Sequence, residues 1–244
     1  MSLPIYKAMI FAAGLGIRLK PFTEKHPKAL FTVNGKTLLD RNVEYLKKYG
    51  ITDIIINLHH FGEQIRSHAI KNNNWGINIS FSDESDELLD TGGGLLKAAD
   101  FFEGTENFVL YNADILTNLN LDKMIQYHLQ NTPLATLSVS DRKTSRYFLF
   151  DKNTRLCGWK NVQTGELKLL QQMDAYNPLA FGGIHIINKQ MLTTRSTIQQ
   201  KFSITDWYLD ICAENTILGF EETGAEFVDV GKMDSVEKAE KLFR

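Results

Sequence analysis

Apolar runs of strand length alternate with segments of helical period along most of the chain. The run from Ala8 to Ala12 predicts a buried strand, and between Leu38 and Tyr49 the apolar positions fall near one helical face. Further strands are predicted at 54–56, 77–81, 108–112, 134–140, 181–187 and 227–230, and further helices at 61–69, 94–102, 121–130, 205–211 and 233–243. This order predicts an α/β fold, with a Rossmann-like, mostly parallel sheet that carries helices on both faces.

The pattern changes after Asp141. Residues 142–176 are richer in polar and turn residues, with turn centres at Asn153 and at Thr164-Gly165, which predicts one or two inserted hairpins. No linker rich in Pro, Gly or Ser divides the chain, and no repeat is visible. We therefore expect one domain over residues 1–244, with a small β-rich insertion around 142–176.

Composition excludes several classes of protein. The 244 residues carry 27 Lys plus Arg and 29 Asp plus Glu, so the basic excess of a nucleic-acid binder is missing. A hydrophobic share of 43% is too high for a disordered chain. The two cysteines are too few for a disulfide framework, and no apolar stretch approaches the roughly 20 residues of a membrane span. We expect a soluble, reduced, cytoplasmic protein without nucleic-acid or membrane partners; the sequence leaves a homo-oligomer open.

A glycine-rich loop follows the first predicted strand. It reads Ala12-Ala13-Gly14-Leu15-Gly16-Ile17-Arg18-Leu19, and Pro27-Lys28 comes shortly after it. The dinucleotide fingerprint needs a third glycine where Leu19 stands, and Gly35-Lys36-Thr37 lacks the first glycine of a Walker loop. Small residues let backbone N–H groups approach phosphate, and Arg18 and Lys28 add two cations, which favours a triphosphate ligand. The alternative is a plain turn with solvated cations.

This string resembles the N-terminal motif of the sugar-1-phosphate nucleotidyltransferases, Ala-Ala-Gly-x-Gly-Thr-Arg-Leu with a downstream Pro-Lys. Ile17 stands where the family usually has Thr or Ser. The resemblance implies the nucleotide-diphospho-sugar transferase fold. It also implies that Arg18 and Lys28 bind the triphosphate, and that the nucleotide is cradled by Ala12, Ala13, Gly14 and Gly16.

Two aspartates follow or occupy predicted strands. Asp114 comes directly after the strand 108–112, and Asp229 alternates with apolar residues in 227–230. Ligands of open α/β folds bind at the carboxyl edge of the sheet, and two carboxylates can hold Mg²⁺ beside substrate phosphates. A strand-end turn for Asp114 and a buried ion pair for Asp229 are the alternatives. The resemblance implies that both are metal ligands, that Mg²⁺ is the cofactor, and that Asp114 is catalytic together with Arg18 and Lys28.

Three consecutive glycines, Gly92 to Gly94, precede the helix predicted from Gly94. They predict a close-approach loop or an anion-binding helix start, with a simple loop-to-helix junction as the alternative. The resemblance implies that Thr91, Gly92 and Gly93 line the base and ribose. The Thr-Gly-Gly-Gly run is especially similar to bacterial N-acetylmuramate 1-phosphate uridylyltransferases, whereas mannose-1-phosphate guanylyltransferases often carry Gly-Thr-Ala-Gly. UTP and N-acetylmuramate 1-phosphate are therefore the expected substrates, with the guanylyltransferase as the alternative.

The sugar side of the site is less marked. Asn57 ends the strand 54–56 and faces the expected pocket, and the family places a sugar-phosphate lysine in a region comparable to the insertion. We expect sugar contacts from Asn57, Asn112, Lys160 and Gly183. The acidic run Asp83 to Glu87 is interpreted as a solvated loop.

The predicted reaction is nucleotidyl transfer to a sugar 1-phosphate. A glycosyltransferase that uses a finished nucleotide sugar is a rival, but it usually needs an Asp-x-Asp metal motif, and Asn112-Ala113-Asp114 is not one. A non-catalytic subunit is a second rival, which loss of Arg18, Lys28 or the aspartates would indicate; all are present. No hexapeptide repeat is visible, so we expect no fused acyltransferase domain.

Overall fold

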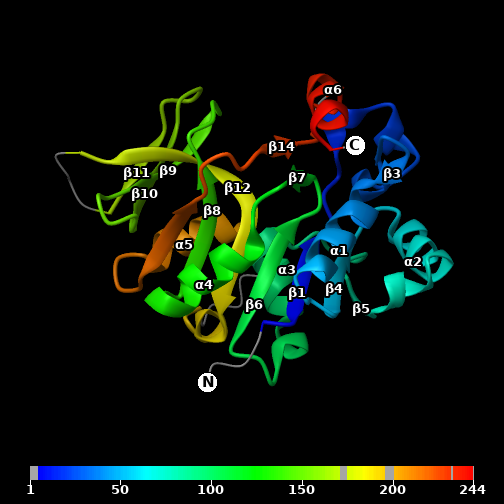
Figure 1. Cartoon of the computed structure of the whole chain (residues 1–244), viewed down its shortest axis with the longest axis horizontal. Coiled ribbons are helices and arrows are strands. Elements are labelled where there is room, and N and C mark those ends of the chain that lie inside the picture. The colour runs from blue at the N-terminus through cyan, green and yellow to red at the C-terminus, as the bar shows by residue number, and fades with distance from the viewer. Residues whose placement is uncertain (1–4, 171–174, 196–200, 232, 244) are drawn as a thin grey trace.

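A mixed β-sheet runs through the protein, with helices on both sides (Figure 1). The structure is a computed structural model that describes residues 5–170, 175–195, 201–231 and 233–243. The strands follow one another in the order β11-β10-β9-β12-β6-β1-β4-β5, and β8 and β13 join the sheet beside β12. The bounds of these strands are Lys7–Phe11 (β1), Asp53–Leu58 (β4), Asn78–Asp83 (β5), Asn107–Asn112 (β6), Ala135–Ser140 (β8), Arg146–Phe150 (β9), Leu156–Asn161 (β10), Leu167–Leu169 (β11), Asn177–Asn188 (β12) and Ile217–Glu221 (β13).

The part of the sheet formed by β6, β1, β4 and β5 is parallel. Met9 of β1 lies opposite Ile55 of β4 on one side and opposite Leu110 of β6 on the other. The long strand β12 then runs antiparallel to β6, β8 and β9. The predicted α/β fold is confirmed, and the parallel strands bring their carboxyl ends to one edge.

Successive residues of β1 point into two separate cores. Ala8 and Ile10 pack in the core beneath α1, α2 and α4, whereas Met9 and Phe11 pack in the core beneath α3 and α5. The helices span Leu38–Lys48 (α1), Gly62–Lys71 (α2), Asp90–Lys97 (α3), Leu121–Asn131 (α4), Ile204–Ile211 (α5) and Met233–Leu242 (α6). Burial on both faces explains why the strand sequences are continuously apolar. Within the described residues, none of the helices combines the length and the apolar character that a membrane span requires.

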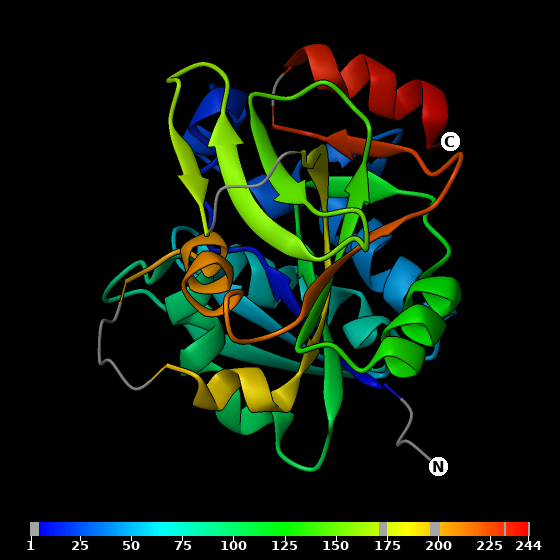
Figure 2. The same ribbon diagram turned by 90° about the vertical axis from the view of Figure 1, so that its left-hand side faces the viewer.

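The predicted β-rich insertion is confirmed as the antiparallel strands β9, β10 and β11, which continue the sheet beyond β12. Figure 2 shows these strands with α5 beneath them. Gly165 adopts a positive φ of 75° in the turn before β11, as the turn prediction there requires. Residues 171–174 of the predicted insertion lie outside the described residues.

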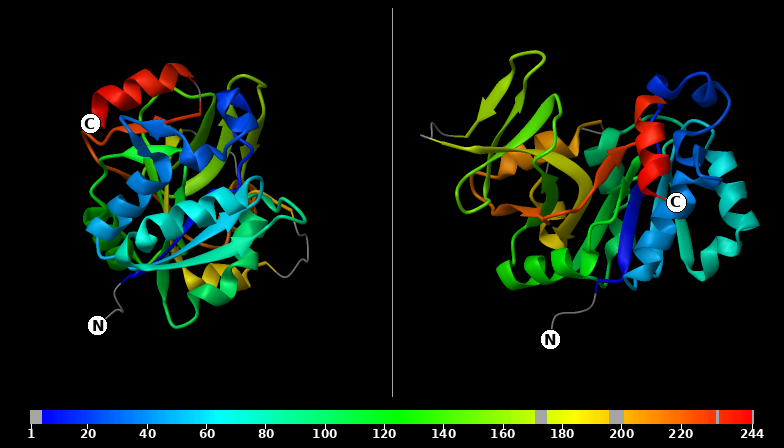
Figure 3. Two further views of the ribbon diagram at one scale, coloured as in Figure 1. Left: turned by 90° about the vertical axis from the view of Figure 1, so that its right-hand side faces the viewer. Right: turned by 45° about the horizontal axis from the view of Figure 1, so that its top comes forward.

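A third, smaller core joins distant parts of the chain. The hairpin of β2 (Thr32–Val33) and β3 (Lys36–Thr37) and the pair of β7 (Ile115–Thr117) and β14 (Phe227–Asp229) surround Val33, Leu116, Val228 and Val236. Helix α6 lies beside β14 and β2 (Figure 3). The side chain of Asn34 donates a hydrogen bond of 2.7 Å to the carbonyl of Glu240. This core holds the strand of Asp229 next to the segment that contains Lys28.

Several elements differ from the prediction. Helix α3 begins at Asp90 instead of Gly94, so the three glycines lie inside the helix and not before it. The short strands β2, β3, β7 and β13 were not predicted. Each has at most five residues, which leaves little room for a periodic pattern.

His128 on α4 is a buried polar group whose hydrogen bonds suit the neutral imidazole. It is 1% exposed, its Nε2 lies 3.0 Å from Asn107 Oδ1 and its Nδ1 lies 2.8 Å from Thr136 Oγ1. The amide oxygen accepts from Nε2–H, and the hydroxyl donates to Nδ1. Burial lowers the pKa of His128 to about 4.

We predict that the protein loses stability as the pH falls below about 6.5, the pKa of an unfolded histidine. Between that pH and about 4, the unfolded state binds a proton that folded His128 does not. This single group lowers the free energy of unfolding by up to about 1.4 kcal/mol per pH unit. Urea unfolding from pH 7 to pH 5 measures the slope. His128→Gln is expected to reduce it, while His26→Gln on the exposed surface is the control; an equal slope in all three proteins would contradict the prediction.

Candidate functional site

A cavity of about 540 Å³ opens where the parallel strands end. Its walls come from the loop after β1, the end of β4, the segment after β5 and the first residues of α3. Asp114, two positions after the end of β6, and Gly231, two positions after the end of β14, complete them. Its lining includes Gly14, Gly16, Ile17, Arg18, Lys28, Asn57, Glu84, Asp90, Thr91, Asp114, Lys201 and Gly231. The cavity therefore lies at the carboxyl edge of the sheet, where ligands of open α/β folds bind.

The glycine-rich loop leaves the sheet at one defined point. The side-chain oxygen of Asn57 accepts hydrogen bonds from the N–H groups of Ala12, at 2.7 Å, and Ala13, at 3.3 Å. Gly14 follows and is exposed, and Gly16 adopts a left-handed conformation with φ of 61°. A Cβ on Gly16 would lie 2.9 Å from Lys28 Cβ, so a side chain there would collide with the lysine stem. Gly16 thus supplies both the turn and the close approach of the loop to Lys28.

Ile17 projects from the same loop into the cavity mouth and is 65% exposed. An exposed branched apolar side chain at this point offers no hydrogen bond to a phosphate. In this part of the loop, direct polar contacts to a ligand depend on the backbone N–H groups and on Arg18.

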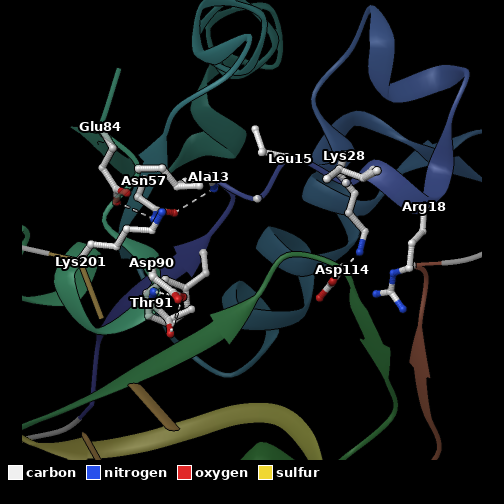
Figure 4. Close-up of a pocket in the computed structure, with 16 residues that line it drawn as sticks. Ala13, Leu15, Arg18, Lys28, Asn57, Glu84, Asp90, Thr91, Asp114 and Lys201 are labelled. Carbon is white, nitrogen blue, oxygen red and sulfur yellow. Dashed lines mark hydrogen bonds and ion pairs between the residues drawn. The ribbon is translucent and has the colours of Figure 1, made fainter. Parts of the chain in front are cut away.

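Four charged side chains meet at one end of the cavity. Lys28 donates to Asp114 Oδ2 and lies 3.9 Å from Asp229 Oδ1, and Arg18 Nη2 lies 3.8 Å from Asp229 Oδ2. Figure 4 shows Lys28 directed at Asp114, with Arg18 beside them. The two predicted cations, which are ten residues apart, and the two predicted carboxylates are therefore brought together from three distant parts of the sequence.

Asp229 lies in a tight environment. Burial raises the pKa of its carboxyl, and the neighbouring charge of Asp114 raises it further. Its Oδ1 is buried and has no hydrogen-bond partner among the described residues. Gly231 leaves the room that this arrangement needs, because a Cβ there would lie 2.5 Å from Asp229 Oδ1 and 2.7 Å from Arg18 Nη2.

The pair Asp114 and Asp229 suits a Mg²⁺ ion. Mg²⁺ prefers carboxylate oxygens, keeps several waters and uses substrate phosphates as ligands, so one or two protein carboxylates are enough. The unpaired Oδ1 of Asp229 is an acceptor that a cation would satisfy. No group of three or more His, Cys, Asp or Glu side chains suited to a metal occurs in the described parts of the chain, so a closed protein cage is not formed there.

A buried hydrogen-bond network forms the other end of the cavity. The amide nitrogen of Asn57 donates to Glu84 Oε1 at 2.7 Å, and the N–H of Leu89 donates to Glu84 Oε2 at 3.1 Å. Glu84 is fully buried, and burial raises the pKa of its carboxyl. Figure 4 shows this network on the opposite side of Ala13 from Lys28 and Asp114. Asn57, predicted as a sugar contact, thus lies on the cavity wall and also holds the start of the glycine loop.

The glycines of α3 serve close packing. The N–H groups of Gly92 and Gly93 donate to the carbonyl of Phe202, at 2.9 and 3.3 Å, and are therefore engaged within the protein. A Cβ on Gly92 would overlap the Phe202 ring, and a Cβ on Gly94 would lie 2.6 Å from Glu84 Oε1. Thr91 lines the cavity, while Gly92 and Gly93 are buried behind it.

The remaining predicted sugar contacts lie apart from one another. Asn112 lines a smaller recess beside Thr91 and Asp114. Lys160 lies on β10 with its ammonium 5.5 Å from the centre of the Tyr147 ring, and Gly183 has a φ of 89° on β12 and packs against Ile115. Neither Lys160 nor Gly183 is among the described residues that line the main cavity.

Three charged residues and one glycine of the cavity were not predicted from the sequence: Glu84, Asp90, Lys201 and Gly231. The interpretation of the acidic run 83–87 as a solvated loop was wrong for Glu84, because this side chain is enclosed by Asn57 and Leu89. The buried Ser82 lies two positions before Glu84, so alternation along the strand was an available signal. Asp90 and Lys201 carried no distinguishing pattern.

Comparison with known proteins places the chain among enzymes that act on nucleotides. The family described as Nucleotidyl transferase matches residues 7–244. The chain is 38% identical over 120 residues to an N-acetylmuramate alpha-1-phosphate uridylyltransferase of Neisseria meningitidis, a match that covers 49% of this chain and 52% of that protein. It is 30% identical over 239 residues to a D-glycero-alpha-D-manno-heptose 1-phosphate guanylyltransferase of Aneurinibacillus thermoaerophilus, covering 96% and 97%.

A solved structure agrees with these sequence matches. HddC from Yersinia pseudotuberculosis, complexed with GMP-PN, superposes with a TM-score of 0.78 at 26% identity, covering 98% of this chain and all of that chain at 100%. The similarity therefore extends across the parallel sheet, the insertion and the C-terminal helix.

We predict that Glu84→Gln loosens the glycine loop without direct contact to it. The amide replaces one carboxylate oxygen by a donor, so either Asn57 or Leu89 loses its acceptor, at a cost of about 1–3 kcal/mol in unfolding free energy. Hydrogen exchange at residues 12–18 is expected to accelerate. Glu87→Gln, on the exposed side of the same segment, is the matched control. Unchanged exchange in the Glu84 variant would show that this network does not hold the loop.

Proposed function

The chain belongs to the nucleotidyl transferase family, and from this premise we propose that it joins a nucleoside triphosphate to a sugar 1-phosphate and releases pyrophosphate. The proposal rests on one observation, which is the cluster of two cations and two carboxylates beside the glycine loop. Its members are Arg18, Lys28, Asp114 and Asp229. Two cations next to the backbone N–H groups of a glycine-rich loop suit a triphosphate, and two carboxylates suit the cation that accompanies it.

The chemistry needs positioning and charge neutralisation more than proton transfer. The attacking oxygen belongs to a phosphomonoester, whose second pKa is about 6, so it is already ionised at neutral pH. A general base is not required. The new bond joins this oxygen to the α-phosphorus, and the bond from the α-phosphorus to the pyrophosphate oxygen breaks.

Each charged residue has a separate task in this proposal. The loop from Gly14 to Gly16 binds phosphate oxygens through its N–H groups, and Arg18 and Lys28 stabilise the charge of the leaving pyrophosphate. Asp114 and Asp229 hold Mg²⁺. When bound, this ion neutralises phosphate charge and orients the reacting groups. Asn57 and Glu84 keep the loop in place from the opposite end of the cavity.

For the substrates, we propose UTP and N-acetylmuramate 1-phosphate. The support is the run Thr91-Gly92-Gly93-Gly94 and the 38% identity to the Neisseria uridylyltransferase over 120 residues. Thr91 lines the cavity beside Asp90 and Lys201 (Figure 4), where a base would lie if the phosphates lie beside Lys28. The role of Lys160 and Gly183 in sugar binding remains part of the same proposal.

A second candidate is guanylyl transfer from GTP to a heptose 1-phosphate. It is favoured by the match to the Aneurinibacillus enzyme, which covers 96% of this chain, whereas the Neisseria match covers 49%. The two candidates share the charged cluster and differ in the base and the sugar.

A screen of pyrophosphate release with four NTPs and a panel of sugar 1-phosphates tests the proposal. We expect UTP with N-acetylmuramate 1-phosphate to give the highest kcat/KM. A site that pairs with one base edge rejects the other bases by large factors. Preference for GTP with a heptose 1-phosphate would replace the first candidate by the second, and no release with any pair would contradict nucleotidyl transfer itself.

We predict that Asp114→Asn lowers kcat at least about a hundredfold, because the change removes a carboxylate charge at the point where phosphate charge must be neutralised. Circular dichroism is expected to show an intact fold. Asp122→Asn, on the exposed side of α4, is the control. Near-normal Mg²⁺-dependent turnover in Asp114→Asn would show that Asp114 is not a catalytic residue.

A further inference from the structure

The ammonium of Lys28 lies between the two carboxylates that are proposed to hold a metal. It donates to Asp114 Oδ2 and lies 3.9 Å from Asp229 Oδ1, the buried oxygen that lacks a hydrogen-bond partner among the described residues. The Lys28 side chain is 11% exposed, against 30% for Asp114 and 40% for Asp229. The lysine is therefore the most enclosed member of the cluster.

Two neighbouring carboxylates repel each other unless a cation lies close to both. In this structure the cation is a side chain, and its stem passes close to the backbone of Gly16. Gly16 has no side chain where a Cβ would lie 2.9 Å from Lys28 Cβ and 3.4 Å from its Cδ. A lysine ammonium is a compact charge on a flexible stem, so its tip can leave one anion for another while the stem stays in place.

We propose that Lys28 is a placeholder cation: in the nucleotide-free protein its ammonium occupies the space between Asp114 and Asp229 and competes with a divalent cation for both. The inference rests on the proposed function in assigning these carboxylates to a metal. It assigns Lys28 a second role beyond binding phosphate, which is to keep the metal affinity of the empty site low.

The consequence is coupling between the metal and the triphosphate. A triphosphate offers new anions to the ammonium, and when the lysine moves to them the carboxylates become available. Such coupling is reciprocal, so the metal and the nucleotide each raise the affinity of the site for the other. The empty site would then take up little metal, and the loaded site would take up both together.

Mn²⁺ binding without nucleotide, measured by the loss of the free-ion EPR signal, tests the inference. We expect Lys28→Met to lower the Kd for Mn²⁺ by about tenfold or more, because a charge-assisted hydrogen bond to Asp114 no longer competes. Arg18→Met is the matched control: its pair with Asp229 is longer, at 3.8 Å, and more exposed, so we expect a gain below about fivefold. Lys28→Met combined with Asp114→Asn is expected to lose the gain.

The placeholder role would be overturned if the Mn²⁺ affinity of Lys28→Met rose no more than that of Arg18→Met. It would also be overturned if the increase in Mn²⁺ affinity persisted in the double variant. Circular dichroism establishes that each variant is folded, and Lys28→Gln replaces Lys28→Met if the latter is not. The readout is independent of turnover. If no substrate pair releases pyrophosphate but Lys28→Met binds Mn²⁺ more tightly, the proposed function is wrong and the cation competition stands. If pyrophosphate is released but the Mn²⁺ affinity of Lys28→Met is unchanged, only the cation competition is wrong.

Discussion

The side-chain amide of Asn57 ends the first strand, and the rest of the site depends on this interaction. Up to Ile10, β1 is hydrogen-bonded to β4 through the backbone. Beyond Ile10, the side-chain oxygen of Asn57 accepts hydrogen bonds from the N–H groups of Ala12 and Ala13. The chain therefore leaves the sheet after Phe11, where β1 ends. Gly14 and Leu15 are then exposed, and Gly16 turns the chain toward Lys28. The buried carboxylate of Glu84 accepts a hydrogen bond from the amide nitrogen of Asn57 and so fixes the orientation of the amide.

The strands that form the framework were predictable because burial on both faces leaves long apolar runs. Ala8 to Ala12 and residues 54–56 and 108–112 are such runs, and all three became central strands. The limits of α3 were not predictable in the same way. Three glycines have low helix propensity, yet the carbonyl of Phe202 and the contact with Glu84 hold them in a helix. Tertiary packing decided the conformation there.

The charged end of the site was predictable as a set of residues but not as an arrangement. Arg18, Lys28, Asp114 and Asp229 each stand in a recognisable local pattern, and the parallel topology implies a shared edge. The pairing of Lys28 with Asp114 joins residues that lie 86 positions apart in the sequence. The unsatisfied oxygen of Asp229 depends on where β14 docks against β7. Gly231 and Glu84 escaped prediction because their significance lies in contacts with residues that are distant in sequence.

The pairing of β14 with β7 also bears on how the protein matures during synthesis. Asp229 reaches the cluster only when β14 has docked beside Ile115 to Thr117 and α6 has closed over the β2 segment. Lys28 and Asp114 are synthesised before Asp229, so the first partner of the lysine is present in the nascent chain before the second. Contacts of such large sequence separation form late and slowly. Until then, Lys28 has Asp114 but not yet Asp229 as an anionic neighbour.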